Sequence, residues 1–180
     1  MKLCKYFLVL FAVCVSSFVW AQNDHFHAGK VIPEFGKIAE VEDMEALPEN
    51  AQFKVSFDVA KQAKAGEVNR SFDTVARFIN MHHAAGVKKE HINLAVVVHG
   101  GAVKDLTSDT YYQAKQKVEN KNKALIKALH EQGVTFYVCG QSAAYYGVNQ
   151  SDLLPGVKLS LSAMTAHALL QQKGFTVNPF

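Results

Sequence analysis

The strongest constraint on the fold is the alternation of strand-like and helix-like segments from residue 52 to the end of the chain. Ile92–Val98 is a short run rich in β-branched residues, as expected of a strand covered on both faces. Residues 53–59 alternate apolar and polar side chains, which predicts a strand with one wetter face. Strands that alternate with helices favour an α/β fold, here a three-layer sandwich around a mostly parallel sheet of about five strands.

The predicted boundaries follow from periodicity and from capping residues. The strands are placed at residues 53–59, 92–98, 134–138, 157–161 and 175–177. The helices are placed at 71–86, with Ser71 as N-cap, at 123–132, at 141–146, and from the N-cap Ser162 to about 172. No helix is predicted in the polar stretch around Tyr111 and Tyr112.

The first 21 residues have the pattern of a secretory signal peptide. Lys2 and Lys5 precede an apolar run from Tyr6 to Val19, and cleavage is expected after Ala21. The run is short for a membrane span, so the mature protein is predicted to be periplasmic or secreted and free of the membrane. An uncleaved N-terminal anchor is the alternative.

The rest of the chain is predicted to form one domain preceded by an arm. Residues 22–50 contain Pro33, Pro48 and several acidic residues, and read as an extended arm, whereas residues 51–180 form the α/β domain. Loss of Lys2 and Lys5 leaves the mature chain close to neutral. Without a basic stripe, nucleic acid is not an expected partner.

Cys139 is the cysteine that remains after cleavage, and it lies where a predicted strand runs into a predicted helix. The N–H groups and dipole at a helix N-terminus favour a thiolate there. An exported protein usually pairs its cysteines, so an unpaired thiol suggests reactivity. The alternative is a small buried hydrophobic side chain.

His99 follows the predicted strand at 92–98, so both His99 and Cys139 stand at carboxyl ends of strands, where open parallel sheets bind ligands. His99 is a candidate cation or proton shuttle, with a loop-bonded structural histidine as the alternative. The candidate binding residues are glycines, whose backbone a ligand can approach closely, and the first residues of the helix behind Cys139: Gly100, Gly101, Gly140, Gln141 and Ser142. Ser142 also reads more simply as a helix-start residue that satisfies backbone N–H groups.

Three strings carry a resemblance to a known family: Val96–Gly101 (VVVHGG), Val138–Ser142 (VCGQS), and Leu153–Val157 (LLPGV) followed by Leu161–Thr165 (LSAMT). Over about residues 50–180 the chain resembles the DsrE/DsrF-like family, in particular its exported single-domain branch. The resemblance implies a small DsrEFH-like α/β domain that assembles into trimers or hexamers. Cytoplasmic members relay sulfur as a cysteine persulfide, and their acceptor cysteine corresponds to Cys139.

The sequence therefore indicates an exported sulfur carrier, or sulfurtransferase, that holds sulfane sulfur on Cys139. Its expected partners are a sulfur donor or acceptor protein, or a small sulfur compound. The alternative is a non-catalytic oligomeric module that binds a small anion or a protein, with Cys139 structural. No metal is expected because the histidines lack zinc-site spacing, and no cofactor is expected because His99–Lys104 is neither a phosphate loop nor a dinucleotide fingerprint.

Overall fold

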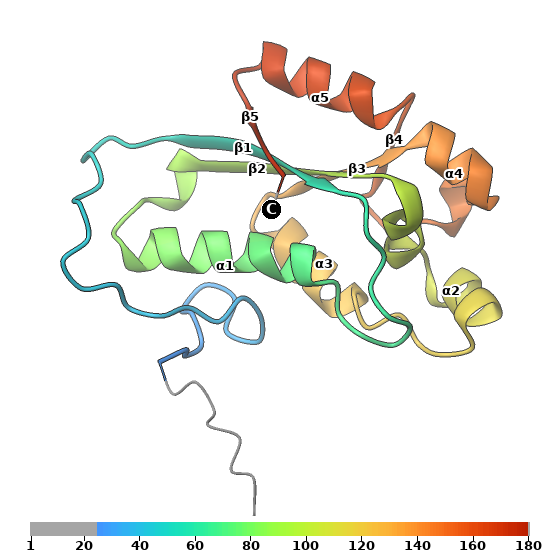
Figure 1. The fold of residues 1–180 in the computed structure, drawn as a ribbon, viewed down its shortest axis with the longest axis horizontal. Helices are drawn as coiled ribbons and strands as arrows, with labels where there is room; N and C mark the ends of the chain where they lie inside the picture. The colour runs from blue at the N-terminus through green and yellow to red at the C-terminus, as the bar shows by residue number, and fades with distance from the viewer. Residues whose placement is uncertain (1–24, 180) are drawn as a thin grey trace, which may run out of the picture.

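A single five-stranded parallel sheet forms the centre of the protein, whose computed structural model describes residues 25–179 (Figure 1). The strands lie in the order β4-β3-β2-β1-β5. Their bounds are β1 (Phe53–Val59), β2 (Ile92–Val98), β3 (Thr135–Cys139), β4 (Lys158–Ser160) and β5 (Thr176–Asn178). The predicted mostly parallel sheet of about five strands is confirmed.

Helices cover both faces of this sheet (Figure 1). The helices are α1 (Arg70–Ala84), α2 (Asp109–Gln116), α3 (Lys123–Glu131), α4 (Gly140–Tyr146) and α5 (Ala163–Gln172), with short 3-10 turns η1 (Lys89–His91), η2 (Gly100–Leu106) and η3 (Gln150–Asp152). In Figure 1, α1 and α3 lie on one side of the sheet and α5 lies on the other. The three-layer α/β architecture is therefore confirmed.

The two faces of the sheet differ in size and polarity. Large aromatic side chains, Phe57, Phe72 and Phe136, fill the core beneath α1 and α3. The core beneath α5 is smaller and is built mainly from Ala95, Val97, Ala166 and Leu170. Because successive strand residues alternate between faces, the polar positions of β1, Ser56 and Asp58, point toward α5. The polar side chains of β1 therefore lie on the face that has the smaller core.

Two details near the helix ends differ from the predicted boundaries. Asn69, rather than Ser71, caps α1, and its Oδ1 accepts a hydrogen bond from the Ser71 N–H at 2.9 Å. The stretch around Tyr112 forms helix α2, because Ser108 caps it and the Tyr112 side chain is fully buried. At α5 the predicted N-cap is confirmed, since the Ser162 hydroxyl accepts from the Thr165 N–H at 3.0 Å.

Residues 25–50 contain no helix or strand and pack along α1. The Asn80 side chain on α1 accepts from the Ile32 N–H at 2.9 Å and donates to the carbonyls of Ile32, Phe35 and Gly36. The predicted signal peptide, residues 1–21, lies outside the described residues. Within residues 25–179 no helix combines the length and apolar character needed to cross a membrane.

A buried carboxylate joins the loops at the carboxyl end of the sheet. Oδ2 of Asp105 accepts from the Ala63 N–H and from Asn69 Nδ2, both at 2.8 Å. Oδ1 is buried without a hydrogen-bond partner among the described residues. Burial raises the pKa of Asp105 to about 6, although those hydrogen bonds and the charge of Lys104 act to lower it. Ionised Asp105 is therefore a destabilising element at neutral pH.

We expect the stability of the protein to fall as pH rises from about 4 to about 6, through the contribution of Asp105. Between the unfolded pKa of 3.8 and the folded value of about 6, the folded state holds more protons, so raising the pH favours unfolding. The loss is about 2–3 kcal/mol and is complete above the folded pKa. Urea unfolding of wild type and Asp105→Asn across this pH range measures the difference.

The Asp105→Asn variant should lack this part of the pH dependence, while the exposed Asp43→Asn variant should retain it. Parallel stability curves for wild type and Asp105→Asn across the whole range would contradict the account.

Candidate functional site

The parallel register brings His99 and Cys139 together at one edge of the sheet. Val98 of β2 pairs with Val138 of β3, so the residues that follow each of them are cross-strand neighbours, about 4.8 Å apart between strands. Two residues earlier, Val97 and Tyr137 pack on the α5 side. By strand alternation, His99 and Cys139 face α5 as well.

An open cleft of about 330 Å³ lies between this edge of the sheet and the start of α5. It is lined by Asp58, His99, Cys139, Gln141, Ser162, Ala163, Met164 and His167. Cys139 is only 5% exposed. The thiol therefore lies in the wall of the cleft rather than on the open surface.

Hydrogen-bond donors converge on the Cys139 sulfur. Burial would raise the pKa of the thiol, but hydrogen bonds from the Ser142 side chain and from the backbone N–H groups of Ser142, Ala163 and Gln141 outweigh burial and lower it. Gln141 and Ser142 belong to the first turn of α4, and Ala163 begins α5. The positive ends of two helices thus favour the thiolate.

Ser142 connects the thiol to β2. Its Oγ accepts a hydrogen bond from the Gly100 N–H at 2.9 Å, which leaves the hydroxyl hydrogen to donate to the Cys139 sulfur. Ser142 therefore bonds both the sulfur and the loop after β2, and so does more than satisfy N–H groups at the start of α4. A polarised hydroxyl of this kind is a stronger donor to an anion.

The predicted glycines shape the backbone around the site. A Cβ at Gly140 would lie 2.7 Å from the Ser160 carbonyl oxygen, so only glycine lets α4 start this close to β4. Gly100 has φ +52° and directs its N–H to Ser142, while Gly101 packs beside Gln62. Of the predicted binding residues, only Gln141 lines the cleft.

A carboxylate bridges two histidines in the cleft. His99 Nε2 lies 3.1 Å from Asp58 Oδ2, and His167 Nε2 lies 2.8 Å from Asp58 Oδ1. The second nitrogen of His167, Nδ1, lies 3.2 Å from the Ser56 hydroxyl. Burial would raise the pKa of Asp58, but the hydrogen bonds from His167 and His99 and their charges lower it.

Sequence reasoning identified Cys139 and His99 but missed Asp58, His167 and Ala163. The available signal was the wetter face of the alternating strand at 53–59, since a carboxylate there needs polar partners across the sheet. His167 is 109 residues from Asp58, so only the packing of α5 reveals their contact. Within residues 25–179, no group of three or more His, Cys, Asp or Glu side chains is arranged to hold a metal ion.

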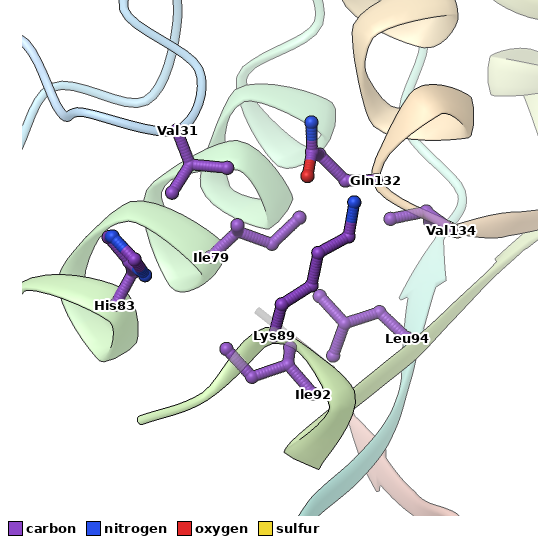
Figure 2. Close-up of a pocket in the computed structure, with 8 residues that line it drawn as sticks. All are labelled: Val31, Ile79, His83, Lys89, Ile92, Leu94, Gln132 and Val134. Atoms are coloured by element: carbon purple, nitrogen blue, oxygen red, sulfur yellow. The ribbon is translucent and has the colours of Figure 1, made fainter. Parts of the chain in front are cut away.

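A second cavity, of about 90 Å³, lies at the other end of the sheet (Figure 2). It is lined by Val31, Ile79, His83, Lys89, Ile92, Leu94, Gln132 and Val134. Figure 2 shows largely aliphatic walls, with the Lys89 side chain extended between Ile79 and Leu94. Because neither a thiol nor a carboxylate is among the residues that line it, this cavity offers less chemistry than the Cys139 cleft.

Replacing Ser142 with alanine should raise the pKa of the Cys139 thiol, because a hydrogen bond to the thiolate is lost. The pH dependence of thiolate absorbance and of iodoacetamide alkylation measures the change. Ser151→Ala, at an exposed position away from the sulfur, is the matched control. An unchanged titration in Ser142→Ala would show that the hydroxyl does not stabilise the thiolate.

Comparison with known proteins gives the fold and the family of this chain. The structure resembles a protein of unknown function, MTH1491 from Methanobacterium thermoautotrophicum (TM-score 0.53, 20% identity), over 72% of this chain and all of that one. It also resembles the ychN protein from E. coli (TM-score 0.52, 15% identity), again over 72% of this chain and all of that one. A search of curated proteins found no match. The sequence profile of the DsrE/DsrF-like family matches residues 54–179, and the chain therefore belongs to the DsrE/DsrF-like family.

Proposed function

We propose that this protein accepts sulfane sulfur as a persulfide on Cys139 and passes it to a partner. The observation that carries the proposal is the set of donors from Gln141, Ser142 and Ala163 around the sulfur, which lowers the pKa of the thiol. A thiolate is the form that attacks a sulfur donor. Family membership, which is associated with sulfur relay, supports the same reading.

The chemistry is a transfer without net oxidation. The Cys139 thiolate attacks the outer sulfur of a donor R–S–SH, a new S–S bond forms, and the donor S–S bond breaks with its electron pair on RS⁻. The N–H groups that stabilise the thiolate are also suited to hold the terminal anion of a deprotonated persulfide. Delivery to an acceptor thiol is the same displacement in reverse.

We also propose that the protein is exported. The pattern of residues 1–21 supports secretion with cleavage after Ala21, giving a mature protein in the periplasm or outside the cell. With Cys139 as its only cysteine, the mature chain cannot form an internal disulfide that would block the thiol.

A non-catalytic binding module is the second candidate function. The specific observation in its favour is the 5% exposure of Cys139, which is the burial expected of a structural cysteine. In that case the cleft would hold a small anion or a segment of a protein partner, and the thiol would only contribute to packing.

Intact mass spectrometry separates the two. The mature protein, recovered from the exported fraction, should gain about 32 Da per transferred sulfur after incubation with sodium polysulfide, and Cys139→Ser should gain nothing. The starting mass also reports whether cleavage follows Ala21. An unmodified wild-type mass, with a folded thiol that resists iodoacetamide, would favour the binding module.

The partner surface of this protein is proposed to include an apolar strip beside the cleft. Leu159 and Leu161 are 46% and 71% exposed, and Met164, close to them in the sequence, is also exposed. Adjacent apolar side chains that remain in water are typical of an interaction surface. The strip runs from the edge strand β4 to the first turn of α5, where Met164 also lines the Cys139 cleft, so a second copy that binds there would border the cleft.

We expect the mature protein to be a trimer or hexamer and the double variant Leu159→Lys/Leu161→Lys to form smaller species, because charge opposes burial of the strip. Light scattering after size-exclusion chromatography measures this. Val41→Lys, at an exposed apolar position in the arm, is the control. A monomeric wild type, or an unchanged double variant, would contradict assembly through the strip.

A further inference from the structure

The cleft contains an acid–base assembly that thiolate stabilisation alone does not need. Asp58 comes from β1, His99 follows β2 and His167 lies on α5, so three separate elements bring these side chains together. Asp58 accepts from His167 at 2.8 Å and faces His99 at 3.1 Å. Both imidazoles use Nε2 for this contact. One carboxylate therefore orients two rings in the cleft that Cys139 lines.

The two histidines are not equivalent. His167 uses both ring nitrogens, with Asp58 on Nε2 and the Ser56 hydroxyl on Nδ1, and its side chain is 15% exposed. His99 uses Nε2 only, and in the described part of the chain no protein group bonds its Nδ1. Its side chain is 33% exposed. His99 is therefore the ring that has a nitrogen left for a molecule in the cleft.

We propose that His99, in its imidazolium form, is a general acid that protonates the thiolate released when Cys139 attacks a sulfur donor, and that Asp58 and His167 are its positioning residues. The inference rests on the proposed function for the identity of the donor, a small persulfide R–S–SH. The acid role itself applies to any displacement at Cys139 that releases an alkyl thiolate.

The step consists of a sulfur transfer to Cys139 followed by a proton transfer from His99. Cys139 S⁻ and R–S–SH give Cys139–S–SH and RS⁻, and the Nδ1–H of His99 then transfers its proton to RS⁻, giving RSH and neutral His99. The ring recovers a proton from solvent. Nε2–H stays hydrogen-bonded to Asp58 throughout, so the carboxylate fixes the neutral ring in its Nε2–H tautomer, whose bare Nδ1 takes up the next proton.

The charges in the cleft suit an imidazolium. The titratable groups that line it are Asp58, His99, Cys139 and His167. His167 and His99 act to lower the pKa of Asp58, so the carboxylate stays ionised beside both rings. The Ser56 hydroxyl, whose oxygen lies 3.4 Å from the Thr176 carbonyl oxygen, completes the chain behind His167. An anion shared by two imidazoles stabilises the protonated form of either one.

Two disulfide probes that differ in their leaving thiol test the acid. Bis(2-hydroxyethyl) disulfide releases an alkyl thiolate that gains from protonation, whereas dithiobis(nitrobenzoate) releases an aromatic thiolate that leaves without a proton. His99→Gln should slow the reaction of Cys139 with the alkyl probe by about 100-fold and change the aromatic reaction by less than about twofold. Thiol release, followed by mass and absorbance, gives both rates.

The positioning residues have their own readout. Asp58→Asn and His167→Gln should lower the alkyl rate by about tenfold and leave the aromatic rate within about twofold, because a His99 ring that is no longer held in place protonates the leaving thiolate less well. His83→Gln, an exposed histidine at the other end of the sheet, is the matched control. If Asp58→Asn does not fold, His99→Gln still decides the question.

Equal slowing of both probes, or no slowing of either, would overturn the acid role. A wild-type thiol that reacts with neither probe would overturn it too, because the cleft would not admit a donor. If Cys139 takes up sulfur but His99→Gln does not slow the alkyl probe selectively, the carrier function stands and the acid role of His99 is wrong. If His99→Gln slows the alkyl probe selectively but Cys139 takes up no sulfur, the acid role stands and the carrier function is wrong.

Discussion

The parallel register of the three central strands is the constraint on which the site depends. Val59 pairs with Val98, Val98 with Val138, and Cys139 with Ser160, so the carboxyl ends of β1 to β4 are level. A slip of one residue in β3 would turn Cys139 into the core beneath α1 and α3 and bring Val138 to the cleft. The large aromatic core on that side resists such a slip, because it fixes which face of each strand is buried.

Backbone geometry then sets the environment of the sulfur. Gly140 lets α4 begin against the end of β4, and Ser162 caps α5 beside it, so two helix N-termini meet at one atom. The backbone N–H donors among them are held in place by the sheet and the helices. Donors that are already oriented stabilise a developing anion without reorganisation. Ser142 adds the link to β2 through Gly100, so the loops after two strands act together.

Much of this arrangement could be predicted from the sequence, because it follows from local pattern. The strands at 53–59 and 92–98 match the structure residue for residue, and Cys139 stands at the predicted strand–helix junction. Helix α2 was missed because its burial depends on one tyrosine rather than on a periodic apolar face. Asn69 replaces Ser71 as N-cap because its own N–H is held by Asn122, 53 residues away, which sequence spacing cannot show. Asp58 and His167 were missed because their contact also joins residues far apart in the sequence.

The strand order also separates two opposing electrostatic requirements. A thiolate is destabilised by a nearby carboxylate, yet an imidazolium acid is stabilised by one. Because β2 lies between β1 and β3, His99 is one strand from Asp58 and one strand from Cys139, while Asp58 and Cys139 are two strands apart, a separation across the sheet of roughly 9.6 Å. At an effective dielectric of about 20, two unit charges repel each other by about 3.5 kcal/mol at a distance of one strand spacing and by about 1.7 kcal/mol at two. Neutral N–H donors can then stabilise the thiolate, so His99 need not pair with the sulfur and keeps its proton for a leaving group.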